Sequence, residues 1–224
     1  MNITLRTRES AFVEHAGFQI GLANTPPLRK RCNDLVNAMY AWRGYETQSD
    51  ANASAHELTL HASCAGRVIG TLTICRDSLS GIPADVLYKK HVDAYRTRGA
   101  SVCELTRFAI EPAHRSKDLL GALFYHAYLH GGICGGLTDA FIEVNPRHVA
   151  FYKRLLRFQQ IGEEKTCERV NAPAVLLHRE VSSVAQQIAE CREQAREHTS
   201  PPQPHRILAG MRPTVARRQA VLAA

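Results

Sequence analysis

Hydrophobic and polar positions follow two different periods along this chain, and the two periods predict strands and helices in alternation. Apolar residues at every second position, rich in Val, Ile and Thr, are typical of strands. We expect strands at residues 17–24, 56–63, 68–75, 102–110, 139–144, 159–167 and 174–179. Apolar residues three or four positions apart predict helices. These fall at residues 28–42, 84–97, 117–129 and 145–154. Interleaved strands and helices indicate the α/β class.

Turn-forming residues mark the breaks between these elements. Thr25-Pro-Pro precedes the first helix, and Gly44 is typical of a helix end. The polar segment 46–55 predicts a mobile loop. The helix at 84–97 either covers a substrate or simply connects two strands, and its pattern fits both. The glycines of residues 131–136 predict a helix end and a flexible connection. They do not predict a phosphate loop, because they do not follow a strand and open a helix.

A change in composition divides the chain after residue 181. The first 181 residues carry all the predicted strands and are long enough for one full hydrophobic core. Residues 182–198 predict a polar helix, and Thr199-Ser-Pro-Pro-Gln-Pro-His predicts a linker or disordered run. The arginine-containing, alanine-rich residues 211–224 predict a disordered basic tail, with weak contact to a membrane surface as the alternative.

Overall composition excludes several classes of protein. A hydrophobic share of 45% and a charged share of 22% are ordinary for a soluble globular protein. No apolar run reaches the roughly 20 residues of a membrane span, and the first residues lack the apolar core of a signal peptide. We therefore expect a cytoplasmic protein without a transmembrane segment. The 7 cysteines and 11 histidines show no ligand spacing, so neither disulfides nor a metal site is predicted.

The net charge of +7 is typical of a protein that meets nucleic acid, an acidic membrane surface or an acidic protein partner. A nucleic-acid surface usually interleaves aromatic residues with a basic stripe, and this chain has no such arrangement. The charge therefore favours an acidic partner or a phosphorylated cofactor over nucleic acid.

A strand, a basic turn and a helix start follow one another within residues 102–129. Pro112 prevents the chain from becoming helical directly after the strand. Ser116 and Asp118 are short polar residues of the kind that cap the start of a helix. Free backbone N–H groups and the positive end of the helix dipole favour an anion there. Arg115 and Lys117 are accordingly candidates for binding a phosphate, or else they are solvated turn residues.

A second block lies downstream, where a buried strand at 139–144 runs into a short helix. Asn145 is suited to cap that helix and Pro146 to stand in its first turn, and Phe151 and Tyr152 follow on the helix. Together the two blocks resemble the GNAT acyltransferase superfamily. The resemblance implies the GNAT fold, with a mixed, mostly antiparallel central sheet, a splayed strand pair and flanking helices.

The phosphate turn departs from the pattern of acetyl-CoA users in that superfamily. They carry glycines that let backbone amides surround a pyrophosphate, whereas the matching positions here, after Arg115, are Asp118 and Leu120. A phosphopantetheine arm on an acyl-carrier protein brings a single phosphodiester. The turn therefore fits that donor better than coenzyme A.

Four segments in combination resemble the N-acyl amino acid synthases, relatives of the acyl-homoserine lactone synthases. They are Tyr40-Ala-Trp-Arg-Gly-Tyr45, Gly70-Thr-Leu-Thr73, Glu104-Leu-Thr-Arg-Phe108 and Asn145-Pro-Arg-His-Val-Ala-Phe-Tyr152. The resemblance covers residues 16–180. It implies transfer of a long acyl chain to the amine of an amino acid. The donor would be an acyl-phosphopantetheine or acyl-CoA, and no cofactor would be tightly bound.

Two departures separate this chain from the lactone synthases. Those enzymes have an arginine where this chain has Thr73. They also have a pair of aspartates after the first helix, and Asp50 is the only clear counterpart of that pair in this chain. Because those residues belong to the lactone chemistry, a simple N-acyl amino acid is the expected product.

Glu104 and Arg107 are the candidate catalytic pair on the central strand. Side chains three apart on a regular strand point to opposite faces, and a β-bulge would bring both to one face. The resemblance implies such a bulge, which splays the sheet to admit the pantetheine arm. Glu104 is then the base that receives a proton from the incoming ammonium, through water. The alternative is a structural ion pair between Glu104 and Arg107.

The remaining candidates surround that strand. Backbone N–H groups near Phe108 and Ala109, with Ile110 beside them, would bind the donor and hold the thioester oxygen. Tyr152 is the candidate acid for the leaving thiolate, or an aromatic packed beside its neighbour.

The acceptor is assigned to the end of the first helix. Arg43, together with Tyr45, would bind the amino acid through its carboxylate. The alternative is an ordinary arginine at a helix C-terminus, where the dipole favours a cation.

Two other functions stay open. One is an acetyl-CoA-dependent N-acetyltransferase with an unusual turn, which binding of coenzyme A would reveal. The other is a catalytically silent protein that binds an acyl ligand. It would bind such a ligand tightly and turn over no donor.

Overall fold

The computed structural model describes residues 13–15, 17–45 and 55–197. Nearly all of the predicted loop at 46–55, including Asp50, lies outside these residues. The predicted linker and basic tail beyond residue 198 lie outside them as well.

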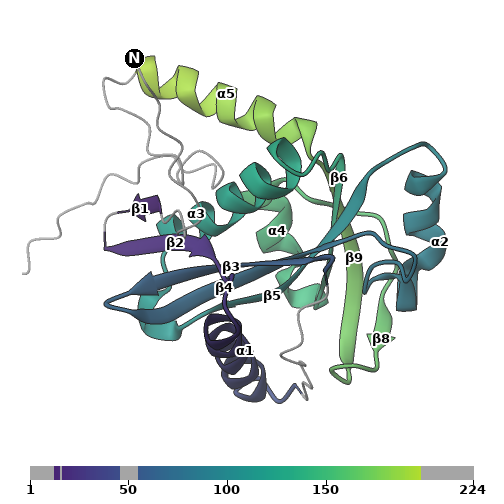
Figure 1. Ribbon diagram of the computed structural model, residues 1–224. Coiled ribbons are helices and arrows are strands. Elements are labelled where there is room, and N and C mark those ends of the chain that lie inside the picture. Colours follow the sequence, from purple (N-terminus) through teal and green to yellow (C-terminus); the bar gives the residue numbers. More distant parts are fainter. Residues whose placement is uncertain (1–12, 16, 46–54, 198–224) are drawn as a thin grey trace, which may run out of the picture.

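The described strands form a mixed sheet that is antiparallel at every pairing except one (Figure 1). In spatial order the strands are β1 (Val13–His15), β2 (Phe18–Leu22), β3 (Glu57–Cys64), β4 (Arg67–Arg76), β5 (Val102–Ile110), β6 (Asp139–Val144), β9 (Ala172–Glu180) and β7 (Gln159–Gln160), with β8 (Lys165–Cys167) also paired to β9. The exception is the parallel pair β5–β6. This arrangement confirms the predicted α/β class and mostly antiparallel sheet.

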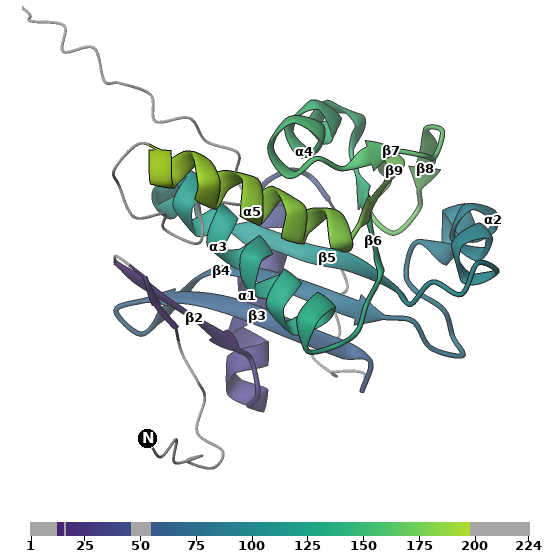
Figure 2. The same cartoon turned by 90° about the horizontal axis from the view of Figure 1, so that it is seen from above.

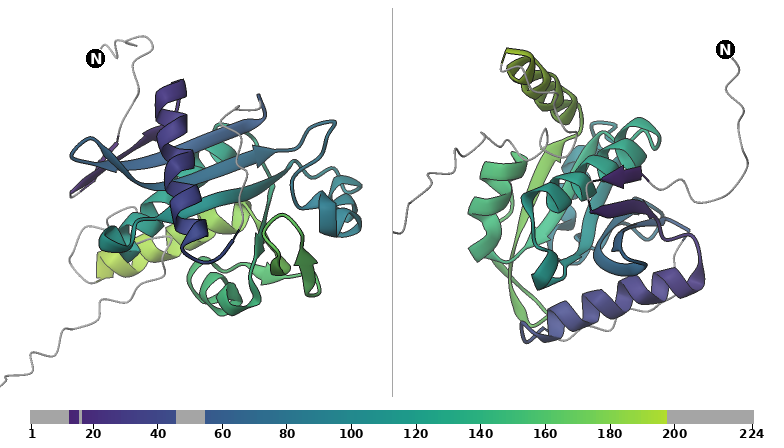
Figure 3. Two further views of the ribbon diagram at one scale, coloured as in Figure 1. Left: turned by 90° about the horizontal axis from the view of Figure 1, so that it is seen from below. Right: turned by 90° about the vertical axis from the view of Figure 1, so that its left-hand side faces the viewer.

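Helices cover both faces of the sheet. They are α1 (Pro26–Ala41), α2 (Asp85–Arg96), α3 (Lys117–Ala127), α4 (Val149–Leu156) and α5 (Ser182–Glu197), with single 3-10 turns η1 (Pro112–His114) and η3 (Pro146–His148) and a π-helical turn η2 (Tyr128–Ile133). Helix α1 crosses one face of the sheet, and α3 lies on the opposite face with α5 alongside it (Figures 2 and 3). Helix α2 stands at one end of the sheet. None of the helices described is both long and apolar enough to cross a bilayer.

Helix α3 is apolar enough to be the centre of the core. Its buried residues include Leu119, Leu123 and Phe124, which pack with residues of β2 to β5 in the largest hydrophobic cluster. Ser116 starts the helix as predicted, because its Oγ accepts a hydrogen bond from the backbone N–H of Leu119 at 3.0 Å.

The helix continues further into the glycine-rich segment than predicted. It ends in the π-helical turn of residues 128–133, in which Gly131 is buried. A Cβ on Gly132 would lie 2.6 Å from a methyl carbon of Val181. The glycines therefore allow the turn to pack closely against the end of β9.

Three other boundaries differ from the prediction. Pro26 and Pro27 stand inside the first turn of α1, where their missing N–H groups have no helical role. The stretch 159–167 forms two short strands, β7 and β8, and Gly162 lies between them where a Cβ would be 2.8 Å from both Tyr88 and Leu176. Strand β1 was not predicted.

Candidate functional site

Strands β5 and β6 are joined at one end only. Three pairs connect them, Val102 with Asp139, Cys103 with Ala140 and Glu104 with Phe141. Beyond Glu104, β5 pairs only with β4, and β6 only with β9. The two strands thus form the predicted splayed pair, with Glu104 at the apex of the split. A cavity of about 1020 Å³ occupies it, lined by residues of α1, β5, β6, α4 and the β8–β9 region and by the turn before α3.

Strand β5 carries the predicted bulge. Thr71 pairs with Ala109 while Thr73 pairs with Thr106, so β5 has one extra residue at this point. Arg107 takes up the distortion with a φ of 50°, in the left-handed region.

The bulge directs Arg107 to a partner on a distant strand. Its guanidinium binds both carboxylate oxygens of Glu57 on β3, at 2.7 and 2.8 Å. Among the ion pairs of the described residues none joins Arg107 to Glu104, so the alternative of a Glu104–Arg107 ion pair is wrong. Arg107 lines the cavity, but its donors already hold Glu57. Any catalytic role of Arg107 stays a prediction.

Glu104 is buried at the apex, with 2% of its surface exposed. Its Oε2 accepts a hydrogen bond from the backbone N–H of Ala84, just before α2. Burial, followed by the charge of Glu143, raises the pKa of Glu104 to about 8, against the opposing effects of Arg169 and the Ala84 N–H. A carboxyl group with a pKa near neutrality can both accept and release a proton under physiological conditions.

Glu143 and Arg169 also line the cavity, and sequence reasoning assigned neither of them a role. Glu143 stands two residues after Phe141, the partner of Glu104, so it shares the face of the sheet on which Glu104 lies. Its side chain is 7% exposed, and its Oε1 accepts from Arg169 Nη2 at 3.3 Å. Its Oε2 is buried and has no N–H or O–H donor among the described residues, while the thiol of Cys167, a weak donor, interacts with the carboxylate. Glu143 directly precedes the Val-Asn-Pro segment, whereas Arg169 carries no local signal.

Tyr152 reaches the cavity from α4, and its ring also packs in the core. The ring contacts those of Phe124, Phe151 and Phe158, and the residue lines the cavity. Burial raises the pKa of the phenol above its ordinary value, so it is protonated at neutral pH. Packing and proton donation are therefore compatible at this residue.

The mouth of the cavity is basic and aromatic. Arg43 lies 3.3 Å from His148, and Arg147 donates to the Tyr45 hydroxyl at 2.7 Å. The guanidinium of Arg115 lies 5.6 Å from the centre of the Trp42 ring, which is 67% exposed. All ten residues predicted from sequence line this one cavity: Arg43, Tyr45, Glu104, Arg107, Phe108, Ala109, Ile110, Arg115, Lys117 and Tyr152.

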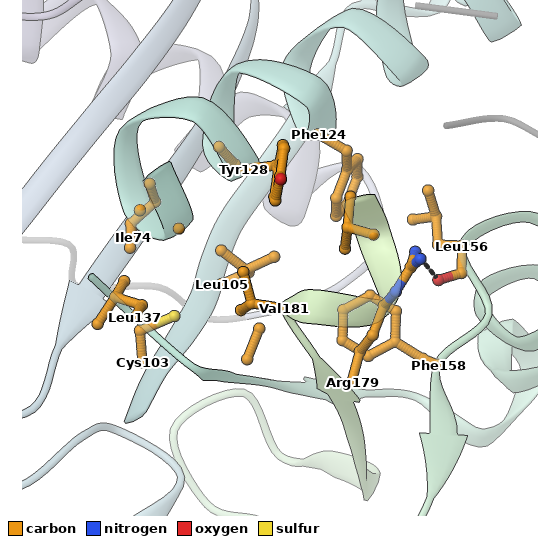
Figure 4. A pocket seen from close by; sticks show the side chains of 15 residues that line it. Ile74, Cys103, Leu105, Phe124, Tyr128, Leu137, Leu156, Phe158, Arg179 and Val181 are labelled. Carbon is orange, nitrogen blue, oxygen red and sulfur yellow. Dashed lines mark hydrogen bonds between the residues drawn. The ribbon is translucent and has the colours of Figure 1, made fainter. Parts of the chain in front are cut away.

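A small apolar pocket lies on the other face of the sheet, beneath α3 and α5. Its volume is about 50 Å³, and Leu105 lines both this pocket and the large cavity. Figure 4 shows Leu105, Phe124 and Tyr128 around it, with Arg179 donating a hydrogen bond to the backbone oxygen of Leu156. The described residues contain no group of three His, Cys, Asp or Glu side chains arranged to hold a metal ion.

Comparison with known proteins adds to this geometry. Residues 31–180 match the model of a family described as N-acyl amino acid synthase FeeM. The solved structure of FeeM, an N-acyl amino acid synthase from uncultured soil microbes, is 25% identical, with a TM-score of 0.69 over 75% of this chain and 93% of that chain. No curated protein matches this chain.

Two more distant structures share the fold. The AHL synthase LasI is 14% identical, with a TM-score of 0.52 over 77% of this chain and 91% of that chain. An acetyltransferase of the GNAT family from Streptococcus pneumoniae is 15% identical, with a TM-score of 0.53 over 73% of this chain and 99% of that chain.

Proposed function

This chain belongs to the N-acyl amino acid synthase FeeM family, and we propose that it moves a long acyl chain from an acyl-carrier protein to the amine of an amino acid. Membership supports N-acyltransferase activity; the donor and acceptor are the proposal. The observation that carries it is Glu104, a buried carboxyl group at the apex of a split sheet whose cavity could admit a thioester arm.

The cavity's side chains suit each step of an acyl transfer. Glu104, ionised, takes a proton from the acceptor's ammonium through water. The amine nitrogen attacks the thioester carbonyl carbon, and backbone N–H groups near Phe108 and Ala109 stabilise the oxyanion. The carbon–sulfur bond then breaks, and Tyr152 protonates the thiolate. The second proton, lost by the nitrogen as the amide forms, restores the Tyr152 phenol. Glu104 releases the first proton to water, which restores the carboxylate.

Three features support an acyl-carrier donor with a long chain. The turn before α3 offers Arg115 and Lys117 for one phosphodiester and lacks the glycines of a pyrophosphate site. The net charge of +7 favours an acidic partner protein. The apolar pocket beyond Leu105 could receive the end of an aliphatic chain.

The test supplies the purified protein with dodecanoyl- or hexadecanoyl-loaded acyl-carrier protein and a mixture of amino acids, and detects N-acyl amino acids by mass spectrometry. We expect product from wild type. The rate should fall by roughly 100-fold or more in Glu104→Gln, which is the usual contribution of a general base to the rate. Glu163→Gln, an exposed glutamate outside the cavity, is the control.

Other outcomes would favour the competing functions. Acetylation from acetyl-CoA with no use of the loaded carrier would point to an ordinary N-acetyltransferase. Tight acyl-ligand binding without turnover of any donor would identify a silent binding protein. Full activity in Glu104→Gln would remove Glu104 from the mechanism.

A further inference from the structure

The cavity contains one ion pair that the acyl-transfer steps do not use. Arg169 and Glu143 are joined at 3.3 Å on the β8–β9 and β6 side of the split, opposite β5. The pair is only half satisfied, because the buried Oε2 of Glu143 has no N–H or O–H donor among the described residues, and the thiol of Cys167 beside the carboxylate is a weak donor. A buried carboxylate oxygen without a partner is costly, and a donor supplied by a ligand would remove that cost.

The chemistry of the pair indicates which ligand fits. A cation beside Oε2 and an anion beside Arg169 would complete both groups, so the ligand should carry opposite charges a few ångströms apart. The ammonium and carboxylate of an α-amino acid have this relation. The guanidinium of Arg169 is 48% exposed, which leaves donors free for a second carboxylate.

We propose that Glu143 and Arg169 form the acceptor subsite, with Glu143 Oε2 receiving the ammonium and Arg169 the carboxylate of an amino acid zwitterion. The assignment deepens the proposed function and rests on it. Glu143 lies near enough to Glu104 for its charge to affect that carboxyl group. An ammonium held there would face the base at the apex.

This assignment replaces Arg43 as the carboxylate-binding residue. Arg43 is exposed at the mouth of the cavity, where it lies against His148. Arg169 lies instead beside a buried carboxylate on the face of the sheet that carries Glu104. A carboxylate at Arg43 would leave the buried Glu143 oxygen without a donor.

The test compares an amino acid with the amine formed by removing its carboxylate, using acyl-carrier donor throughout. We expect wild type to prefer the amino acid, and Arg169→Met to raise its KM by about 10- to 100-fold, the loss of a charge-assisted pair. The KM for the donor and the KM for the amine should not change. Loss of the Arg169 charge raises the pKa of Glu104 further and lowers kcat, but equally for both acceptors at one pH. Glu143→Gln should raise the KM for both acceptors, because both carry the ammonium.

A matched surface pair provides the controls. Arg157 and Glu190 form an ion pair at 3.0 Å outside the cavity, with side chains 52% and 40% exposed. Arg157→Met and Glu190→Gln should leave the KM of both acceptors unchanged. Equal use of amine and amino acid by wild type, or an equal rise in KM for both acceptors in Arg169→Met, would overturn the assignment while leaving acyl transfer intact.

Calorimetry keeps the two proposals separable. An N-dodecanoyl amino acid should bind wild type more tightly than Arg169→Met by about 10-fold or more, and Arg157→Met should bind it as wild type does. Equal binding by wild type and Arg169→Met would contradict the subsite even if no acceptor were turned over. Absence of any N-acyl product would count against the proposed function alone.

Discussion

Glu104 makes the stability of this protein depend on pH in an unusual direction. Folding raises its pKa from an ordinary 4.5 to about 8. Between these values the folded state binds a proton that the unfolded state lacks, so stability falls as pH rises through this window. Glu104→Gln removes the effect. We therefore expect the melting temperature of the variant, relative to wild type, to be higher at pH 9 than at pH 5.

Melting curves at the two pH values check this expectation. Glu163→Gln is the control, since Glu163 is exposed and ion pairs with Lys165 and His91 lower its pKa. The melting temperature of that variant, relative to wild type, should not rise between pH 5 and pH 9. A pH-independent difference between Glu104→Gln and wild type would mean that Glu104 does not carry the raised pKa.

The same ionisation should control the reaction rate. A general base must be ionised, so kcat/KM should rise with pH to a plateau above about 8, the pKa of Glu104. Glu143→Gln removes a negative charge that raises this pKa, and its midpoint should lie at lower pH. A pH–rate profile of each protein measures both effects. Identical midpoints would show that the Glu143 charge does not act on the base.

Within strand β5, the bulge depends on the ion pair between Arg107 and Glu57. The pair is largely shielded from water, with side chains 26% and 16% exposed. Glu57→Gln leaves the Arg107 guanidinium without its carboxylate, and we expect a loss of about 2 kcal/mol in unfolding free energy, between the values for surface and buried pairs. Activity should also fall, because the bulge positions the backbone N–H groups near Phe108 and Ala109 that are proposed to stabilise the oxyanion.

Urea denaturation and initial rates measure these two losses. Asp34→Asn removes an exposed i,i+4 pair with Lys30 on α1 and should cost at most about 0.5 kcal/mol. If Glu57→Gln lowered activity without lowering stability, the ion pair between Arg107 and Glu57 would not be what stabilises the bulge.

The bulge also marks how far the sequence could predict this site. The three-residue spacing of Glu104 and Arg107, combined with the family resemblance, was enough to predict a bulge and a split sheet. It could not identify Glu57 as the partner of Arg107, because the pair spans 50 positions of sequence. Arg169 was missed for the same physical reason. It reaches Glu143 across the folded sheet, and no local pattern records that contact.

On the scale of the whole molecule, α5 is attached more firmly than its polar sequence indicates. Val184 and Ile188 are buried in the main core. Arg179, buried on β9, donates to the side chains of Gln187 at 2.7 Å and Ser183 at 3.2 Å. Burial lowers the pKa of Arg179 to about 10. This value is still well above neutral pH, so the guanidinium stays charged. The start of α5 thus supplies oxygen atoms that a buried cation needs.

The boundary expected after residue 181 can be tested by truncation. A chain ending at Val181 loses two buried apolar side chains, each contributing about 1.5–3 kcal/mol, and leaves donors of Arg179 without acceptors. We expect it to lose roughly 3 kcal/mol or more in unfolding free energy, or to fail to fold. A chain ending at Glu197 keeps these contacts and is the control. If the shorter chain were as stable as the control, α5 would be an appendage, and the acyltransferase domain would end at residue 181 as the composition predicts.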